Sequence, residues 1–243
     1  MDFQIEKHNI KLSGAMNIRD LGGYPTTDGG YTKKGVYYRS DSLHDLTAED
    51  IAALKSFGVT MQVDLRSQQE VLLKPSKLQG VPGIDYYNIG LLDHIQSSNF
   101  ENLPESMAAL YIDLLDQNHN KFADIFRLLL SSEGICIFNC TAGKDRTGVL
   151  SMLLLRLVSV DEDMIAADYA VSAANLSEFI TFHKAQTLRK GQELPDYIFL
   201  SDPQDMITTM QHLKDYYMDA VGFLTSCGIT GTEIIELRKR MLG

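Results

Sequence analysis

Strand-like runs and longer helical stripes alternate along this chain. Three runs, at 59–67, 84–92 and 135–138, are bounded by glycine or by polar turns, which is typical of strands in a parallel sheet. Between them, apolar residues recur every three or four positions, which predicts helices with one buried face. The pattern predicts an α/β fold with a central, mostly parallel sheet flanked by helices.

The helices carry start and stop signals. A helix is expected over 42–58, where Thr47 is the N-cap and Asp50 completes a capping box. A short helix starts at Gln68 and is stopped by Pro75. Further helices are expected over 104–129, 147–158, 161–176, 177–226 and 228–243.

The strand at 135–138 leads directly into a cysteine, Cys140, and then into a helix that is apolar on nearly every side. A loop between a strand and a helix N-terminus aims the backbone N–H groups of residues 141–146 at one point, next to the positive end of the helix dipole. Such a point attracts phosphate. It also favours a thiolate, because a cysteine beside cations at a helix N-terminus can have a pKa of about 3.5–7.5.

Arg146 is separated from Cys140 by five residues, so its planar guanidinium can return to the loop and hold two phosphate oxygens. Gly143 and Gly148 permit unusual backbone angles and close approach. One alternative is an ordinary buried cysteine. A rhodanese or arsenate-reductase loop is a weaker alternative, since the first needs no threonine-glycine helix start and the second usually needs resolving cysteines nearby.

Composition narrows the class of protein. The 243 residues are 44% apolar with only 6 prolines, which argues against disorder and favours one domain. The net charge of −10 argues against a nucleic-acid partner. The histidines lack paired metal spacing, and Cys136 and Cys140 would lie about 13 Å apart on a strand, too far for a shared metal or a disulfide. No metal or cofactor is expected.

The N-terminal residues lack a signal-peptide pattern, and no run of eighteen apolar residues occurs. These observations predict a cytoplasmic location without stable membrane insertion. Export without a recognisable signal peptide stays open.

The loop resembles the Cys-x5-Arg signature of protein tyrosine phosphatases. Its form, Ala-Gly-Lys-Asp-Arg-Thr-Gly, is that of bacterial tyrosine and dual-specificity phosphatases similar to mycobacterial protein tyrosine phosphatase B. Other segments resemble the family in the same order: Asn17-Ile-Arg-Asp, Tyr38-Arg-Ser, Asp64-Leu-Arg-Ser, Asp168-Tyr169 and the closing Gly-Ile-Thr helix. The resemblance covers nearly the whole chain. It implies a single cysteine-phosphatase-like domain over 1–243, in which about 174–226 either packs on the sheet or forms a helical lid.

The resemblance implies a two-step reaction. Cys140 attacks phosphorus to form a cysteinyl-phosphate, which water then hydrolyses to inorganic phosphate. Arg146 and the loop amides would stabilise the equatorial oxygens, and Thr147 would hydrogen-bond the sulfur. The substrate would be a phosphorylated protein, with phosphotyrosine first and phosphoserine or phosphothreonine next, or a phosphoinositide. The residues expected to bind it are Thr141, Ala142, Gly143, Lys144, Asp145 and Thr147.

A general acid must protonate the leaving oxygen. Asp93, after the strand at 84–92, matches the family's acid by its spacing, and Asp145 inside the loop is the second choice, as an acid or a substrate contact. The remaining acidic candidates are interpreted as structural partners of arginines: Asp20 with Arg19 and Arg39 nearby, and Asp64 beside Arg66.

Two residues in or beside the loop bear on which substrates bind and on how the rate depends on pH. Lys144 adds a cation beside Arg146, which in similar phosphatases accompanies phosphoinositide activity; alternatively it caps the loop or pairs with Asp145. The family usually has histidine before the nucleophile, where this chain has Asn139. Asparagine still donates to a backbone carbonyl but does not titrate, so changing it to histidine is expected to shift the acid limb of the pH–rate profile or raise the rate. The alternative function is a catalytically weak phosphate-binding module.

Overall fold

The computed structural model describes residues 5–91, 103–189, 191 and 194–242. Its strands form one five-stranded sheet in the order β1-β2-β5-β3-β4, in which only β1 is antiparallel to its neighbour. The predicted α/β fold with a mostly parallel sheet is confirmed. The strands are β1 Arg19–Asp20, β2 Tyr37–Ser40, β3 Val59–Asp64, β4 Asp85–Asn88 and β5 Ile135–Asn139.

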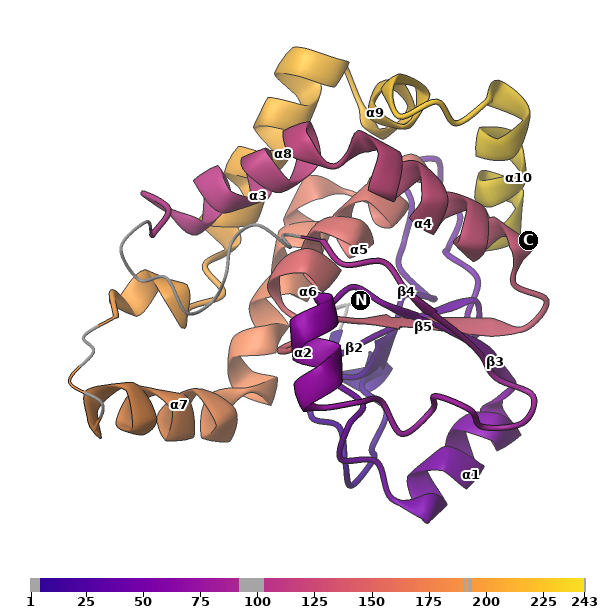
Figure 1. Cartoon of the computed structure of the whole chain (residues 1–243). Coiled ribbons are helices and arrows are strands. Elements are labelled where there is room, and N and C mark those ends of the chain that lie inside the picture. Colours follow the sequence, from indigo (N-terminus) through magenta and orange to yellow (C-terminus); the bar gives the residue numbers. More distant parts are fainter. Residues whose placement is uncertain (1–4, 92–102, 190, 192–193, 243) are drawn as a thin grey trace.

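Helices lie on both sides of this sheet (Figure 1). Their bounds are η1 Ile5–His8, α1 Ala48–Phe57, α2 Gln68–Leu73, α3 Met107–Gln117, α4 His119–Ser131, α5 Asp145–Leu157, α6 Glu162–Asn175, α7 Ser177–Arg189, η3 Asp196–Ile198, α8 Pro203–Tyr217, α9 Ala220–Ser226 and α10 Gly231–Leu242. No helix in the described ranges is long and apolar enough to cross a membrane.

The middle strand separates two apolar cores. Ile135 and Ile137 of β5 join the core beneath α1, whereas Cys136 and Phe138 join the larger core that contains α5. This alternation follows from the two-residue period of a strand. The apolar run of α5 is buried on nearly every side, as its sequence predicts.

The helix predicted over 42–58 begins later than expected. Thr47 and Asp50 form the capping box, so α1 starts at Ala48 and the residues from Ser42 to Leu46 are not helical. An N-cap residue has extended rather than helical backbone angles, and Thr47 has a φ of −80° and a ψ of 169°. Pro75 follows the end of α2, in agreement with the predicted stop.

The sheet register brings three carboxyl ends together. Asn139 at the end of β5 pairs with Ser40 of β2 on one side and with Asp64 of β3 on the other. Ligands of open parallel sheets bind at such carboxyl edges. The loop that contains Cys140 starts at this point.

Candidate active site

The loop that joins β5 to α5 holds its carbonyl groups by hydrogen bonds from outside the loop. The Cys140 carbonyl accepts from Asn139 Nδ2 at 3.3 Å. The Thr141 carbonyl accepts from the backbone N–H of Ser42 at 3.0 Å. Both donors belong to strand ends or their flanks, so the sheet itself fixes the first half of the loop.

The next two carbonyls are held by the N-terminal segment and β2. Asn17 Nδ2 donates to the Ala142 carbonyl at 3.0 Å and to the Gly143 carbonyl at 3.2 Å. The guanidinium of Arg39 adds a hydrogen bond to the Gly143 carbonyl at 2.8 Å. Asn17 and Arg39 are fully buried, so these donors are fixed in place.

This arrangement decides where the loop N–H groups point. In a trans peptide the N–H group points away from the C=O group. Because the carbonyls of residues 140–143 are tied to the surrounding protein, the N–H groups of residues 141–144 face the opposite side, next to the N-terminus of α5. Converging N–H groups at a helix N-terminus make an anion site.

Gly143 permits the close approach of this loop to β2. Its φ is +66°, and a Cβ atom there would lie 2.5 Å from backbone atoms of Ser40 and Asp41. Gly148, by contrast, lies within α5 and does not have a positive φ; its Cβ would meet the Tyr169 ring at 3.2 Å. The expectation of unusual backbone angles is therefore confirmed for Gly143 and wrong for Gly148, where the constraint is packing.

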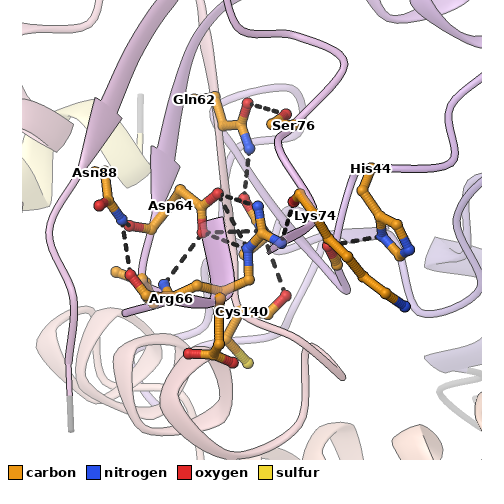
Figure 2. Close-up of polar contacts among 12 residues, drawn as sticks. His44, Gln62, Asp64, Arg66, Lys74, Ser76, Asn88 and Cys140 are labelled. Carbon is orange, nitrogen blue, oxygen red and sulfur yellow. Dashed lines mark hydrogen bonds and ion pairs between the residues drawn. The ribbon is translucent and has the colours of Figure 1, made fainter. Parts of the chain in front are cut away.

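Cys140 is 1% exposed at the base of the loop and lies below a buried polar network in Figure 2. In this network, Asp64 accepts hydrogen bonds from Arg66 Nε at 2.9 Å and Nη2 at 2.7 Å. Asn139 lies between Asp64 and Gln62, and its Oδ1 accepts from Gln62 Nε2 at 2.7 Å. The predicted structural pairing of Asp64 with an arginine is confirmed.

Arg146 binds a carboxylate from α2. Its Nη1 and Nη2 donate to the two oxygens of Glu70 at 2.7 and 2.9 Å, and Thr141 Oγ1 also donates to Glu70. Burial opposes ionisation of Glu70, but its hydrogen bonds and attraction to Arg146 lower its pKa to about 2. Nη1 also donates to the Leu65 carbonyl at 3.4 Å, and Nη2 also donates to Thr141 Oγ1 at 3.3 Å. Glu70 thus holds the fork of Arg146 in one plane beside the loop, and a phosphate would have to replace the two longer contacts.

Lys144 and Asp145 bind residues in or next to helices η3 and α3. Lys144 is 4% exposed, and its Nζ donates to the carbonyls of Ile198 and Leu200 at 2.7 and 2.8 Å. It also lies 3.4 Å from Asp145, so the alternative of an internal ion pair is what the structure contains. Asp145 in turn accepts a hydrogen bond from Tyr111 at 2.5 Å.

Thr147 lies in the first turn of α5 and is fully buried. Its Oγ1 makes no hydrogen bond to any of the residues that the structure describes. A buried hydroxyl without a partner costs free energy, so it is available to an acceptor placed at the loop.

The sequence profile of the tyrosine phosphatase family matches residues 10–243. The chain belongs to the tyrosine phosphatase family. It is therefore a phosphatase family enzyme whose substrates carry phosphate, in agreement with the resemblance of its loop. The match spans almost all of the described structure, including the segments that hold the loop carbonyls.

Two curated proteins and one solved structure are similar to this chain. A tyrosine-protein phosphatase of Nostoc commune is 30% identical over 226 residues, which cover 85% of this chain and 74% of the relative. The triple specificity protein phosphatase PtpB of Mycobacterium tuberculosis is 25% identical over 285 residues, or 96% of this chain and 99% of the relative. The crystal structure of P. aeruginosa TpbA in complex with pTyr has a TM-score of 0.40 and 14% identity, covering 83% of this chain and 91% of that one.

The phosphatase structure brings most of the predicted site residues together in one loop. Cys140 through Thr147 lie between β5 and the first turn of α5, and their catalytic and binding roles stay predictions. Asp93, the first choice for the general acid, lies outside the described residues. Asp145 lies within the loop and is held by Tyr111.

The arginines of the N-terminal segment find a different partner from the one expected. Arg19 Nε and Arg39 Nη1 bind Asp168 of α6 at 2.7 and 2.5 Å. Asp20 instead accepts from the backbone N–H groups of two glycines in its own segment, Gly22 and Gly35. The expected ion pairs of Arg19 and Arg39 exist, but the interpretation of Asp20 as their partner is wrong, because its strand position directs it into the adjoining turns.

Sequence reasoning missed three contributors to the phosphatase loop. Glu70 holds Arg146, Gln62 holds Asn139, and Asn17 holds two loop carbonyls. The sequence did contain a signal for Glu70, since Ser67 and Glu70 form a capping box, but that signal explains the helix and not the arginine contact.

Proposed function

We propose that this phosphatase hydrolyses phosphomonoesters through a cysteinyl-phosphate on Cys140, with protein phosphotyrosine as its main substrate. The outward hydrogen bonding of the carbonyls of residues 140–143 carries this proposal, because it leaves a set of inward N–H groups above a cysteine. Backbone donors fixed in this way stabilise charge that develops on phosphate oxygens without reorganising.

The proposed steps assign each group one task. The Cys140 thiolate attacks phosphorus, and the bond to the leaving oxygen breaks as that oxygen takes a proton from the general acid. Water then attacks phosphorus, the sulfur–phosphorus bond breaks, and inorganic phosphate leaves. Arg146 and the loop N–H groups bind the equatorial oxygens. The unpartnered Thr147 hydroxyl donates to the sulfur as it becomes a leaving group.

Two aspartates remain proposed as the general acid. Asp93 is supported by its place in the sequence after β4, which ends at Asn88 and not at 92 as the pattern predicts, and Asp145 by its place where the loop enters α5. The hydrogen bond from Tyr111 and the proximity of Lys144 hold one oxygen of Asp145 away from solvent and leave the other oxygen of the carboxyl for a substrate.

A wider substrate range is part of the proposal. The M. tuberculosis relative is named a triple specificity protein phosphatase, which supports a substrate range wider than phosphotyrosine. The proposed range includes phosphoserine, phosphothreonine and phosphoinositides. The proposed contribution of Lys144 to phosphoinositide binding requires its ammonium to exchange the carbonyls of Ile198 and Leu200 for a phosphate.

We propose that the chain is a single phosphatase domain over 1–243 and that the lid lies in the first half of 174–226. Helix α7 has no buried residue, and the segment after it reaches the loop through Lys144. In contrast, α8 and α9 contribute buried side chains to the core around α5, as a structural part of the domain does.

A turnover panel tests the proposed function. Purified protein is assayed without added metal on phosphotyrosine and phosphoserine peptides and on a soluble phosphoinositide. The wild type is expected to turn over phosphotyrosine steadily, and Cys140→Ser is expected to lose at least about a thousandfold in rate while retaining phosphate binding. Cys227→Ala is the matched control, because this cysteine is also buried but lies after α9, and it is expected to retain activity.

Other outcomes of the panel decide against the proposal. Phosphate binding by the wild type without turnover would identify the alternative, a phosphate-binding module. Turnover that needs a metal and survives Cys140→Ser would contradict the cysteine mechanism.

A further inference from the structure

Asn139 can hold the nucleophile loop only in one orientation of its amide. Its Nδ2 donates to the Cys140 carbonyl at 3.3 Å and lies 3.5 Å from a carboxylate oxygen of Asp64, while its Oδ1 accepts from Gln62 Nε2 at 2.7 Å. A half turn of this amide would place its oxygen against two acceptors and its nitrogen against a donor. The partners of Asn139 therefore decide whether the Cys140 carbonyl is held.

Gln62 is itself fixed in direction. Its Oε1 accepts from Ser76 Oγ at 2.8 Å, and Ser76 Oγ accepts from the backbone N–H of Leu78 at 3.2 Å. Because Asn139 Nδ2 faces two acceptors, its Oδ1 faces Gln62, so Gln62 must present Nε2 to Asn139 and Oε1 to the Ser76 hydroxyl. This series of hydrogen bonds runs from Leu78 through Ser76 and Gln62 to Asn139 and ends on the Cys140 carbonyl. Figure 2 shows Ser76 and Gln62 near Asp64 and above Cys140.

The side chains of this hydrogen-bonded series are buried, so a reversed hydrogen bond would leave a donor or an acceptor without a partner. Gln62 and Asn139 are 0% exposed and Ser76 is 5% exposed. A buried donor or acceptor without a partner destabilises the folded state. Leu78, whose N–H binds Ser76 Oγ, is anchored in the apolar core beneath α1, so Ser76 is held by a packed segment far from the loop in sequence.

We propose that Gln62 is a positioning residue that orients the Cys140–Thr141 peptide through the amide of Asn139. The proposal rests on the proposed role of Cys140 as the nucleophile. Holding the Cys140 carbonyl outward turns the Thr141 N–H toward the thiolate and the phosphate. The pair of neutral amides performs this task without titrating, where the family usually has a histidine.

The test removes the amide of Gln62 and measures the thiol directly. Gln62→Met keeps a side chain of similar length but frees the Asn139 amide. The pH midpoint of Cys140 alkylation by iodoacetamide is expected to rise, and kcat/KM on an aryl phosphate is expected to fall about tenfold, through kcat. Ser76→Ala leaves Gln62 in place. It is expected to change the alkylation midpoint and kcat/KM in the same directions as Gln62→Met, but by smaller amounts.

Neither Gln62→Met nor Ser76→Ala removes a charged group near the loop, so a shift of the alkylation midpoint reports the orientation of the Cys140–Thr141 peptide rather than a lost charge. The charged groups near the loop are Arg39, Asp41, Asp64, Arg66, Glu70, Lys144, Asp145 and Arg146. Asn88→Ala is the matched control: it removes hydrogen bonds of 2.9 and 2.7 Å to the carbonyls of Asp64 and Arg66 at the same sheet edge, without touching Asn139. Its alkylation midpoint is expected to stay that of the wild type.

A double-mutant cycle separates positioning from a general loss of structure. In an Asn139→Ala background, Gln62→Met is expected to produce no further change in the alkylation midpoint. An equal shift with and without the Asn139 amide, or no shift in Gln62→Met itself, would overturn the proposal. Because alkylation needs no substrate, a wild type that binds phosphate without turnover would refute the proposed function and leave this test intact.

Discussion

Single side chains decide how the phosphatase loop presents its arginine. Glu70 binds both terminal nitrogens of Arg146 and also contacts Thr141, so one carboxylate holds the arginine and the loop backbone together. An arginine aligned in advance loses less freedom when it binds a phosphate. If Arg146 binds phosphate as proposed, this contact contributes to the rate as well as to stability.

Glu70→Gln tests this contact. The variant is expected to lose about tenfold in kcat/KM on an aryl phosphate, because the guanidinium is no longer held by two charge-assisted hydrogen bonds. Steady-state kinetics measure the change. Glu162→Gln is the control, since it removes a surface pair with Arg156, and it is expected to have wild-type kinetics.

The same pair predicts a pH dependence of stability. The pKa of Glu70 is lowered to about 2 in the folded protein, from an ordinary value of 4.5. Its contribution to stability is therefore complete above about pH 4.5 and lost as the pH falls toward 2. Urea unfolding is expected to show the wild type more stable than Glu70→Gln at pH 6 and a shrinking difference at pH 3. A constant difference would contradict the assignment.

At the scale of elements, the geometry of the loop depends on β5, from which it starts, and on its close approach to β2. The φ of +66° at Gly143 and the backbone of β2 leave no room for a side chain, and the carbonyl of the same residue is held by Arg39. Both the close packing of the loop on β2 and the direction of the loop N–H groups therefore depend on Gly143.

Gly143→Ala is expected to abolish most activity. The added methyl would meet the backbone of Ser40 and Asp41, so the loop must move and its N–H groups lose their common target; kcat/KM is expected to fall at least about a hundredfold. Gly58→Ala is the matched control, because Gly58 also has a positive φ but no atom near its Cβ. It is expected to lose about 1–2 kcal/mol of stability and no activity. Equal loss of activity in both would refute the argument.

Across the whole molecule, one buried carboxylate connects the N-terminal segment, the sheet and α6. Asp168 is 1% exposed and binds Arg19 and Arg39, and Tyr24 donates to it at 2.7 Å. Burial opposes its ionisation, but the two arginines hold its pKa well below the ordinary value. Since Arg39 also donates to the Gly143 carbonyl, the fold and the loop share this ion cluster.

Asp168→Asn is expected to destabilise the protein by about 3–5 kcal/mol, because it leaves two buried guanidinium groups without a negative partner. Urea unfolding at pH 7 measures the loss. Asp196→Asn, which removes the exposed pair with Lys184, is the control and is expected to cost less than about 1 kcal/mol. Similar losses in both variants would show that the cluster is not a structural centre.

Local features of this fold could be predicted because their causes are local. The cap at Thr47 and Asp50 spans four residues, β5 is one apolar run, and the Cys140–Arg146 loop is continuous in sequence. Helix α1 begins at Ala48, later than the pattern over 42–58 predicts, since a helical pattern does not reveal where the backbone becomes extended before its cap.

The sequence by itself determined the α/β order of elements, the Cys140–Arg146 loop and the phosphatase family, because each depends on residues that are neighbours or on a motif of fixed spacing. Only the tertiary structure decided what holds that loop. Glu70 is 76 residues from Arg146, Gln62 is 77 from Asn139, and Asn17 is 125 from Ala142. Contacts over such separations follow from sheet register and packing, and neither leaves a mark at fixed spacing in the sequence.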